Sequence, residues 1–318
     1  MKNNKNLAPV KMDKKSARAR TWKQIKKNKV VYFMILPVII YYILFHYKPM
    51  YGILIAFMDY SPRKGVFGSD WVGFQHFQDF FGSYYFWRLL KNTLKLSFTT
   101  LLLGWPAPIF LALLINELKS KKFSKLVQTI TYMPHFVSLV VLCGMIRQFV
   151  SSNGFITNFF TQFFGYDGAN MLSKGELWIP IYLISNIWAG CGWGSIVYLA
   201  ALTGIDSQLY DAAKVDGANR WKQMIHVTIP GILPTIVIML IMRIGQLMSV
   251  GYEKTILLYN DGILEVSDII STYVYRMGLA GRQFSYSTAV DIFNSVVNII
   301  LVVLANWISK KTTETSLW

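Results

Sequence analysis

Six long apolar runs constrain what this chain can fold into more than any other feature of its sequence. Each run is mostly apolar and close to the length of about 20 residues that a helix needs to cross a bilayer. The runs are residues 30–47, 93–115, 127–150, 177–202, 230–250 and 287–308. The chain is 53% hydrophobic and only 15% charged, which is less charge than soluble domains carry. We therefore expect an all-α integral membrane protein with six transmembrane helices in one membrane domain, residues 30–310.

The positive charges predict how these helices are oriented. Eleven of the 32 Lys and Arg residues lie in the tail, residues 1–29, where Asp13 is the one acidic residue. Such a tail can bind nucleic acid, but no nucleic-acid-binding module accompanies it, so we expect no such partner. With the tail inside, its side of the membrane holds 20 Lys and Arg, against nine in the opposite loops. The positive-inside rule then places both termini, including residues 311–318, in the cytoplasm.

Helix-breaking residues lie inside several of the apolar runs. Pro37, Pro134 and Pro180 are three of them, and residues 190–194 form a glycine-rich cluster in the fourth run. Membrane bundles tolerate such residues where neighbouring helices satisfy the freed backbone groups. The breakers predict kinked spans, which suit a structure that opens and closes. Ordinary membrane-helix composition explains any single one of them equally well.

Several kinds of site have no support in the sequence. Cys143 and Cys191 lie in predicted spans without a CxxC motif or a Cys/His cluster, so we expect neither a disulfide framework nor a metal site. No carboxylate pair or ligand set marks a catalytic centre. The phosphate-binding motif GxxxxGK[ST] does not occur, so we expect a chain that binds no cofactor and is not an enzyme.

One polar segment, residues 206–229, separates the fourth and fifth runs and faces the cytoplasm in the predicted orientation. Asp206 can cap a helix over residues 207–216, and Gly217 can supply the left-handed conformation that ends it. A second short helix is expected over residues 219–227, until Pro230 opens the fifth span.

The same segment is suited to contact a cytoplasmic partner. Ala212 and Ala213 let another backbone approach closely, and charged side chains surround them. These are Asp211, Lys214, Asp216, Arg220 and Lys222. The alternative is a plain amphipathic loop between two spans.

The stretch "YDAAKVDGANRWKQMIHVTIPGILP" resembles the signature loop of permease subunits in binding-protein-dependent ABC importers. In that family the pattern is Glu-Ala-Ala, a Gly a few residues on, and then an apolar residue followed by Pro. Asp211 stands where Glu is usual, and Ile229 with Pro230 stands where Leu-Pro is commoner. Residues that match the pattern as they stand are Ala212, Ala213, Asp216, Gly217 and Ala218.

The resemblance covers roughly residues 25–310. "GWGSIVYLAALTGID" and "WVGFQHFQDFF" resemble segments of carbohydrate permeases, and "DIISTYVYRMGL" looks like the outer loop of the branch that imports oligosaccharides, including aldouronate-type systems. The resemblance implies a type I ABC importer permease, multi-pass in the bacterial cytoplasmic membrane, that forms half of a pathway for oligosaccharide uptake.

The resemblance also implies partners. They are a second homologous permease subunit, two ATPase subunits that use ATP and Mg²⁺, and an extracellular solute-binding protein. The coupling loop, residues 206–229, would insert into a cleft on the ATPase. Asp211, Ala212, Ala213, Asp216, Gly217 and Arg220 would carry that contact.

Polar residues inside the spans are candidates for the substrate path. Asp291, Asn294 and Asn298 recur at helical spacing on one face of the sixth run, and Arg243 with Gln246 lies in the fifth. Two interpretations remain open: a structural Arg243–Asp291 ion pair, or a polar lining that binds sugar hydroxyls. Trp188 and Trp193 in the fourth run are further candidates, because sugar faces stack on aromatic rings. Interface belts and lipid-facing packing are the commoner roles of tryptophan in membrane proteins.

Between the fifth and sixth runs, residues 266–277 have apolar residues at helical spacing, which predicts one amphipathic helix on the outer surface. Ser267 or Asp268 can cap its start.

Two other functions compete with the permease. An ion-coupled secondary transporter of small solutes would show inverted repeats and intramembrane acid clusters, and neither is found in the sequence. A membrane enzyme would need the catalytic residues that the chain lacks.

Overall fold

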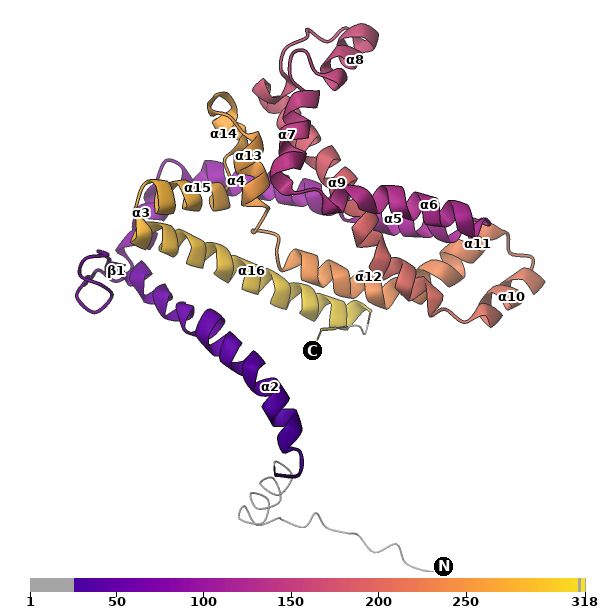
Figure 1. Cartoon of the computed structure of the whole chain (residues 1–318), viewed down its shortest axis with the longest axis horizontal. Coiled ribbons are helices and arrows are strands. Elements are labelled where there is room, and N and C mark those ends of the chain that lie inside the picture. Colours follow the sequence, from indigo (N-terminus) through magenta and orange to yellow (C-terminus); the bar gives the residue numbers. More distant parts are fainter. Residues whose placement is uncertain (1–25, 314–315, 318) are drawn as a thin grey trace, which may run out of the picture. The chain divides into compact units, whose positions relative to one another are not determined.

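The computed structural model describes residues 26–313 and 316–317, so most of the predicted basic tail lies outside the described residues. The described chain is mostly helical, with one short antiparallel ladder between β1 (Met58–Asp59) and β2 (Asp70–Trp71) (Figure 1). By internal contacts it forms two compact units, one ending at Leu54 and one beginning at Ile55.

The first apolar run is a helix that is longer than expected. It comprises α2 (Lys29–Tyr42), η1 (Ile43–Tyr47) and η2 (Pro49–Phe57), which together are long enough to cross a membrane. Pro37 lies inside α2 without ending it, and none of the residues of α2 is buried.

Three more predicted spans are confirmed, each a few residues longer than expected. The second is built from α4 (Phe86–Thr99), η3 (Thr100–Gly104) and α5 (Pro106–Asn116). The fourth is α9 (Gly175–Thr203), and the sixth is α16 (Phe284–Thr312).

The third run, residues 127–150, is broken near Pro134, as the helix breaker predicted, and the bend is sharper than a kink within one helix. The chain forms α6 (Lys121–Tyr132), η4 (Met133–Phe136) and α7 (Leu139–Phe149), with a bend of 100° between the two arms. Ser138 takes an extended conformation and its hydroxyl accepts a hydrogen bond from the Val141 amide at 3.4 Å, so it caps a new helix in a new direction. The described chain therefore has five spanning helices, or six if this bent pair counts as one span.

The fifth span starts earlier and ends earlier than predicted. It comprises α11 (Arg220–Gln223), η6 (Met224–Thr228) and α12 (Ile229–Ile244). Asn219 caps it by accepting a hydrogen bond from the Lys222 amide at 2.9 Å, and Pro230 falls within the first turn of α12. The helix runs from Arg220 through the wider turn of η6 into α12, so Pro230 does not separate the second loop helix from the span.

The prediction of one outer amphipathic helix over residues 266–277 is wrong, because the helix breaks at Asp268. It forms α14 (Leu264–Ser267), α15 (Ile270–Tyr275) and η8 (Arg276–Ala280). Asp268 does not cap α15. Its carboxylate accepts two hydrogen bonds from the Arg276 guanidinium, at 2.6 and 3.1 Å, and lies 3.7 Å from that of Arg88.

The glycine cluster in the fourth span does not break the helix, contrary to expectation. A Cβ on Gly192 would lie 2.0 Å from the Thr131 carbonyl oxygen of α6, and one on Gly194 would lie 3.0 Å from Pro108 of α5. These glycines allow close helix packing, as small residues do in membrane bundles. The remaining elements are α3 (Gln75–Gly82), α8 (Phe155–Phe164), η5 (Met171–Ser173), α10 (Ser207–Val215), α13 (Tyr252–Leu258) and η7 (Asp261–Ile263).

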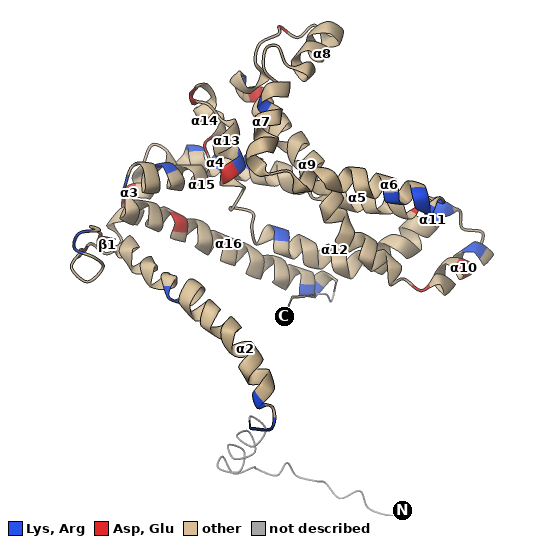
Figure 2. Cartoon of the chain, viewed as in Figure 1, with Lys and Arg blue, Asp and Glu red and all other residues tan. Residues whose placement is uncertain are grey.

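Loops that are predicted to share one side of the membrane lie at the same end of the second unit. At one end Arg220 forms a 3.4 Å ion pair with Glu117, and Figure 2 shows Lys and Arg gathered on α6, α10 and α11. At the other end the Asn92 amide donates to the Glu265 carbonyl at 2.8 Å, and the Tyr60 amide donates to the Ser285 hydroxyl at 3.0 Å.

This arrangement predicts which residues an impermeant thiol reagent will reach. In a chain with Cys143 and Cys191 replaced by Ala, Tyr84→Cys should be labelled on intact cells and Val215→Cys only after lysis. Both positions are well exposed, at 87% and 88%. Labelling of position 215 from outside would overturn the assignment of both ends.

The Asp268 carboxylate should be a main determinant of stability. Asp268→Asn leaves Arg276 and Arg88 without a counter-charge, so we expect the free energy of unfolding to fall by about 3 kcal/mol. Asp70→Asn is the control, since the Asp70–Lys64 pair is mostly exposed and should contribute under about 1 kcal/mol. The measurement is chemical unfolding of the purified protein in detergent. Equal losses of stability in Asp268→Asn and Asp70→Asn would contradict the prediction.

Candidate functional site

The loop over residues 206–229 has the predicted helix–glycine–helix form. The Asp206 carboxylate accepts a hydrogen bond from the Gln208 amide at 2.9 Å and caps α10. Gly217 has φ +73°, the left-handed conformation that ends this helix. The second helix starts at Arg220 and continues into the fifth span without a break.

The loop exposes apolar as well as charged side chains. Asp211, Ala212, Asp216 and Gly217 are exposed and Ala213 is half-buried. Sequence reasoning named these residues but missed three exposed apolar ones, Leu209, Val215 and Trp221. Large apolar residues in an otherwise polar loop were the signal that could have found them.

A pocket of about 400 Å³ lies between the second, fourth and fifth spans and contains two of the predicted path residues, Arg243 and Gln246. Asn186 and the glycines of α9 line its opposite wall. Arg243 is the one charged residue of its lining, and no carboxylate pairs with it in the part of the chain that the structure describes. Trp105 also lines this pocket, with its indole nitrogen buried. The pocket therefore presents the donor groups of the Arg243 guanidinium, which suit an anionic or oxygen-rich ligand.

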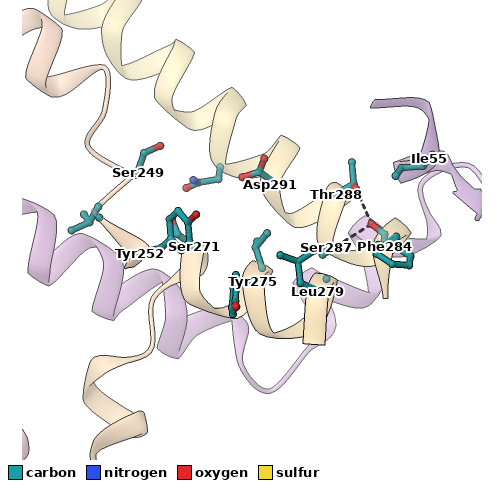
Figure 3. A pocket seen from close by; sticks show the side chains of 15 residues that line it. Ile55, Ser249, Tyr252, Ser271, Tyr275, Leu279, Phe284, Ser287, Thr288 and Asp291 are labelled. Atoms are coloured by element: carbon teal, nitrogen blue, oxygen red, sulfur yellow. Dashed lines mark hydrogen bonds between the residues drawn. The ribbon is translucent and has the colours of Figure 1, made fainter. Parts of the chain in front are cut away.

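A second pocket, of about 500 Å³, contains Asp291 and Asn294 of α16. Figure 3 shows Asp291 and Ser271, which come from α16 and α15, lining the same space. Asn294 is only 3% exposed, and its side-chain oxygen accepts no hydrogen bond. This pocket presents unused acceptors, which suit the hydroxyl groups of a ligand. Within the described residues, no group of three or more His, Cys, Asp or Glu could hold a metal ion.

The structure does not bring Arg243 and Asp291 together. They line different pockets, and the described residues contain no ion pair between them. The interpretation of Arg243 and Asp291 as a structural ion pair is therefore not supported by this structure.

Asn298 takes a structural position instead of lining the pocket. Its side-chain oxygen accepts from the Met248 amide and its amide donates to the Ser249 hydroxyl, both at 2.9 Å. It thereby fixes the segment after α12 to α16.

The two tryptophans lie away from both polar pockets. Trp188 lines a third, apolar pocket of about 650 Å³ with phenylalanines of α7 and α8. Trp193 stacks on His135, with ring centroids 4.5 Å apart and planes 5° from parallel. Sequence reasoning missed Asn186, although a polar residue inside an apolar run was a signal for it.

Together, these features define a multi-spanning membrane protein with polar pockets between its helices and a helical loop at one end. A model of the family described as "binding-protein-dependent transport system inner membrane component" matches residues 104–314. The chain belongs to this family and is the multi-pass, non-catalytic permease component of an ABC importer in the bacterial cytoplasmic membrane.

Similar proteins cover nearly the whole chain. The polygalacturonan/rhamnogalacturonan transport system permease protein YteP of Bacillus subtilis (strain 168) is 46% identical over 305 residues, 96% of this chain and 95% of the relative. Protein LplB of the same organism is 42% identical over 294 residues, 92% of each chain. A chain in the crystal structure of a bacterial alginate ABC transporter, in complex with alginate pentasaccharide-bound periplasmic protein, is 45% identical with a TM-score of 0.86, covering 94% of this chain and 100% of that one.

Separate pockets predict independent effects of the two charged path residues. Exchanging the charges, with Arg243→Asp and Asp291→Arg together, should not restore what either single change loses, because distant residues without shared partners act additively. The test compares expression and substrate uptake among the parent, the two single variants and the double variant. Partial rescue in the double variant would show that the two side chains meet in another state of the protein.

Proposed function

We propose that this chain forms half of a pathway for acidic oligosaccharides, built with a second, homologous permease subunit. The observation that carries the substrate class is the Arg243 pocket, where a guanidinium without a carboxylate partner among the described residues lines a space between the spans. Guanidinium groups bind carboxylates through charge-assisted hydrogen bonds. A sugar that carries a carboxylate fits such a lining better than a neutral one does.

The relatives support the same substrate class. YteP is a permease for polygalacturonan and rhamnogalacturonan, and polygalacturonan is a polymer of a sugar acid. A solved transporter with a chain 45% identical to this one imports the acidic polysaccharide alginate. An extracellular solute-binding protein would deliver the sugar, and one solved relative is in complex with such a periplasmic protein.

In this proposal the second pocket binds the neutral part of the sugar. The Asp291 carboxylate and the unpartnered Asn294 oxygen accept hydrogen bonds, and sugar hydroxyls donate them. A carboxylate there would repel the acid group of the substrate and favour its hydroxyl-bearing face. Ion-coupled secondary transport is not favoured, because the chain belongs to an ABC importer family.

The energy for transport would come from two separate ATPase subunits that use ATP and Mg²⁺, while this chain binds no cofactor. The loop over residues 206–229 is the proposed contact with them, through Asp211, Ala212, Ala213, Asp216, Gly217 and Arg220. Its exposed Leu209 and Val215 support this role, because large apolar side chains on an otherwise polar loop favour a partner surface.

Gly217 offers a sharp test of this coupling. Gly217→Pro cannot adopt φ +73°, whereas Gly217→Asn tolerates it, so the two variants differ mainly in loop shape. In proteoliposomes with the complete importer, Gly217→Pro should abolish ATP-driven uptake and Gly217→Asn should retain most of it. Equal uptake by the two variants would contradict a coupling role.

The same proteoliposomes test the substrate class. Wild-type importer should take up a uronate oligosaccharide faster than its carboxyl-reduced, neutral analogue, with each sugar supplied as a preloaded complex with the binding protein. Faster uptake of the neutral sugar would refute the acidic pathway and leave the coupling result unaffected.

A further inference from the structure

Lys254 in α13 is a buried cation without an anionic partner. Only 5% of the residue is exposed, and no carboxylate pairs with it among the described residues. Its ammonium donates to the Tyr182 carbonyl at 3.2 Å, lies 4.7 Å from the centre of the Tyr182 ring, and reaches the Asn186 side-chain oxygen at 3.5 Å. Burial lowers the pKa of this ammonium to about 8.

Burial of this ammonium lowers the stability of the folded chain, so folding by itself does not explain why a lysine is present. An ammonium taken out of water loses several kcal/mol of hydration unless an opposite charge offsets it, and a carbonyl and an amide offset it only in part. A methionine of similar length would fill the same space without that cost. Unpaired charges within a membrane protein usually face a path for a solute.

Asn186 connects Lys254 to the Arg243 pocket. Asn186 lines that pocket, and its oxygen is the atom that faces the Lys254 ammonium. An amide has one acceptor end and one donor end. With the oxygen held by Lys254, the amide N–H groups of Asn186 are left for the pocket, on the wall opposite Arg243.

Building on the proposed function, we propose that Lys254 is a specificity-determining residue for acidic sugars. It orients the Asn186 amide so that its N–H groups point at the substrate, and it adds a second positive charge behind them. The substrate carboxylate then meets Arg243 on one side and the Asn186 amide on the other. Lys254 acts through Asn186 and is a positioning residue.

A purely structural role is the competing explanation, because Lys254 also links α13 to α9. The two roles differ in what they do to selectivity. A link between helices affects every substrate alike. A group that orients a donor and supplies charge affects only the sugar with a carboxylate.

The test compares Lys254→Met and Lys254→Arg in the complete importer, with the uronate oligosaccharide and its carboxyl-reduced analogue each preloaded on the binding protein. Loss of one charge-assisted hydrogen bond corresponds to about 10-fold or more, so Lys254→Met should lower the uronate-to-neutral ratio of uptake rates by about that factor. Lys254→Arg keeps the charge and should retain most of the ratio. Lys91→Met, at an exposed lysine of α4, is the control and should leave the ratio unchanged.

Three results would overturn the proposal. An unchanged ratio, or equal loss for both sugars, would assign Lys254 a structural role. Failure of Lys254→Met to assemble with its partners would also assign Lys254 a structural role, since Met fills the same space without the cost of a buried charge. Absence of any uronate preference in the wild-type importer would refute the proposed substrate class instead, so the two failures are distinguishable.

Discussion

A lipid environment requires every backbone polar group to find its partner within the protein, and the architecture of this chain follows from that requirement. Uninterrupted helices such as α9 and α16 meet it through their own hydrogen bonds. At two places where a helix starts in a new direction or a span begins, a side chain provides a missing partner. Ser138 does so at the 100° bend, and Asn219 does so where the fifth span begins.

The two polar pockets of the second unit differ in the hydrogen-bonding groups that they leave unused. One offers the Arg243 guanidinium, and the other offers Asp291 and the Asn294 oxygen. A sugar acid carries a group that suits each pocket: its carboxylate accepts hydrogen bonds and its hydroxyls donate them. Two sites of this kind would recognise the acid group and the diol face of one substrate separately.

The sequence predicted what depends on local chemistry and missed what depends on distant contacts. Apolar runs located the spans, and the need for a positive φ located Gly217, because both are properties of a few neighbouring residues. Pro134 marked a break in the third span, yet the size of the bend is set by the extended Ser138 and by packing against α9.

The start of the fifth span shows a different limit. Asn219 and Pro230 are both helix-start signals, and the structure uses the first as the cap and accommodates the second inside the helix. Among the site residues, Arg243 and Asp291 were found as charges inside apolar runs. The contact between Lys254 and Tyr182 joins positions 72 residues apart, so no local pattern reveals it.

The unbroken helix from Arg220 to Ile244 has a mechanical consequence. Trp221 at the loop end and Arg243 at the pocket end are 22 residues apart on one helix, or roughly 33 Å at the rise of an α-helix. A break at Pro230 would have made a joint there. Without such a break one helix joins the loop to the pocket, so a displacement of the loop by the proposed ATPase contact would be carried along this helix toward the Arg243 guanidinium.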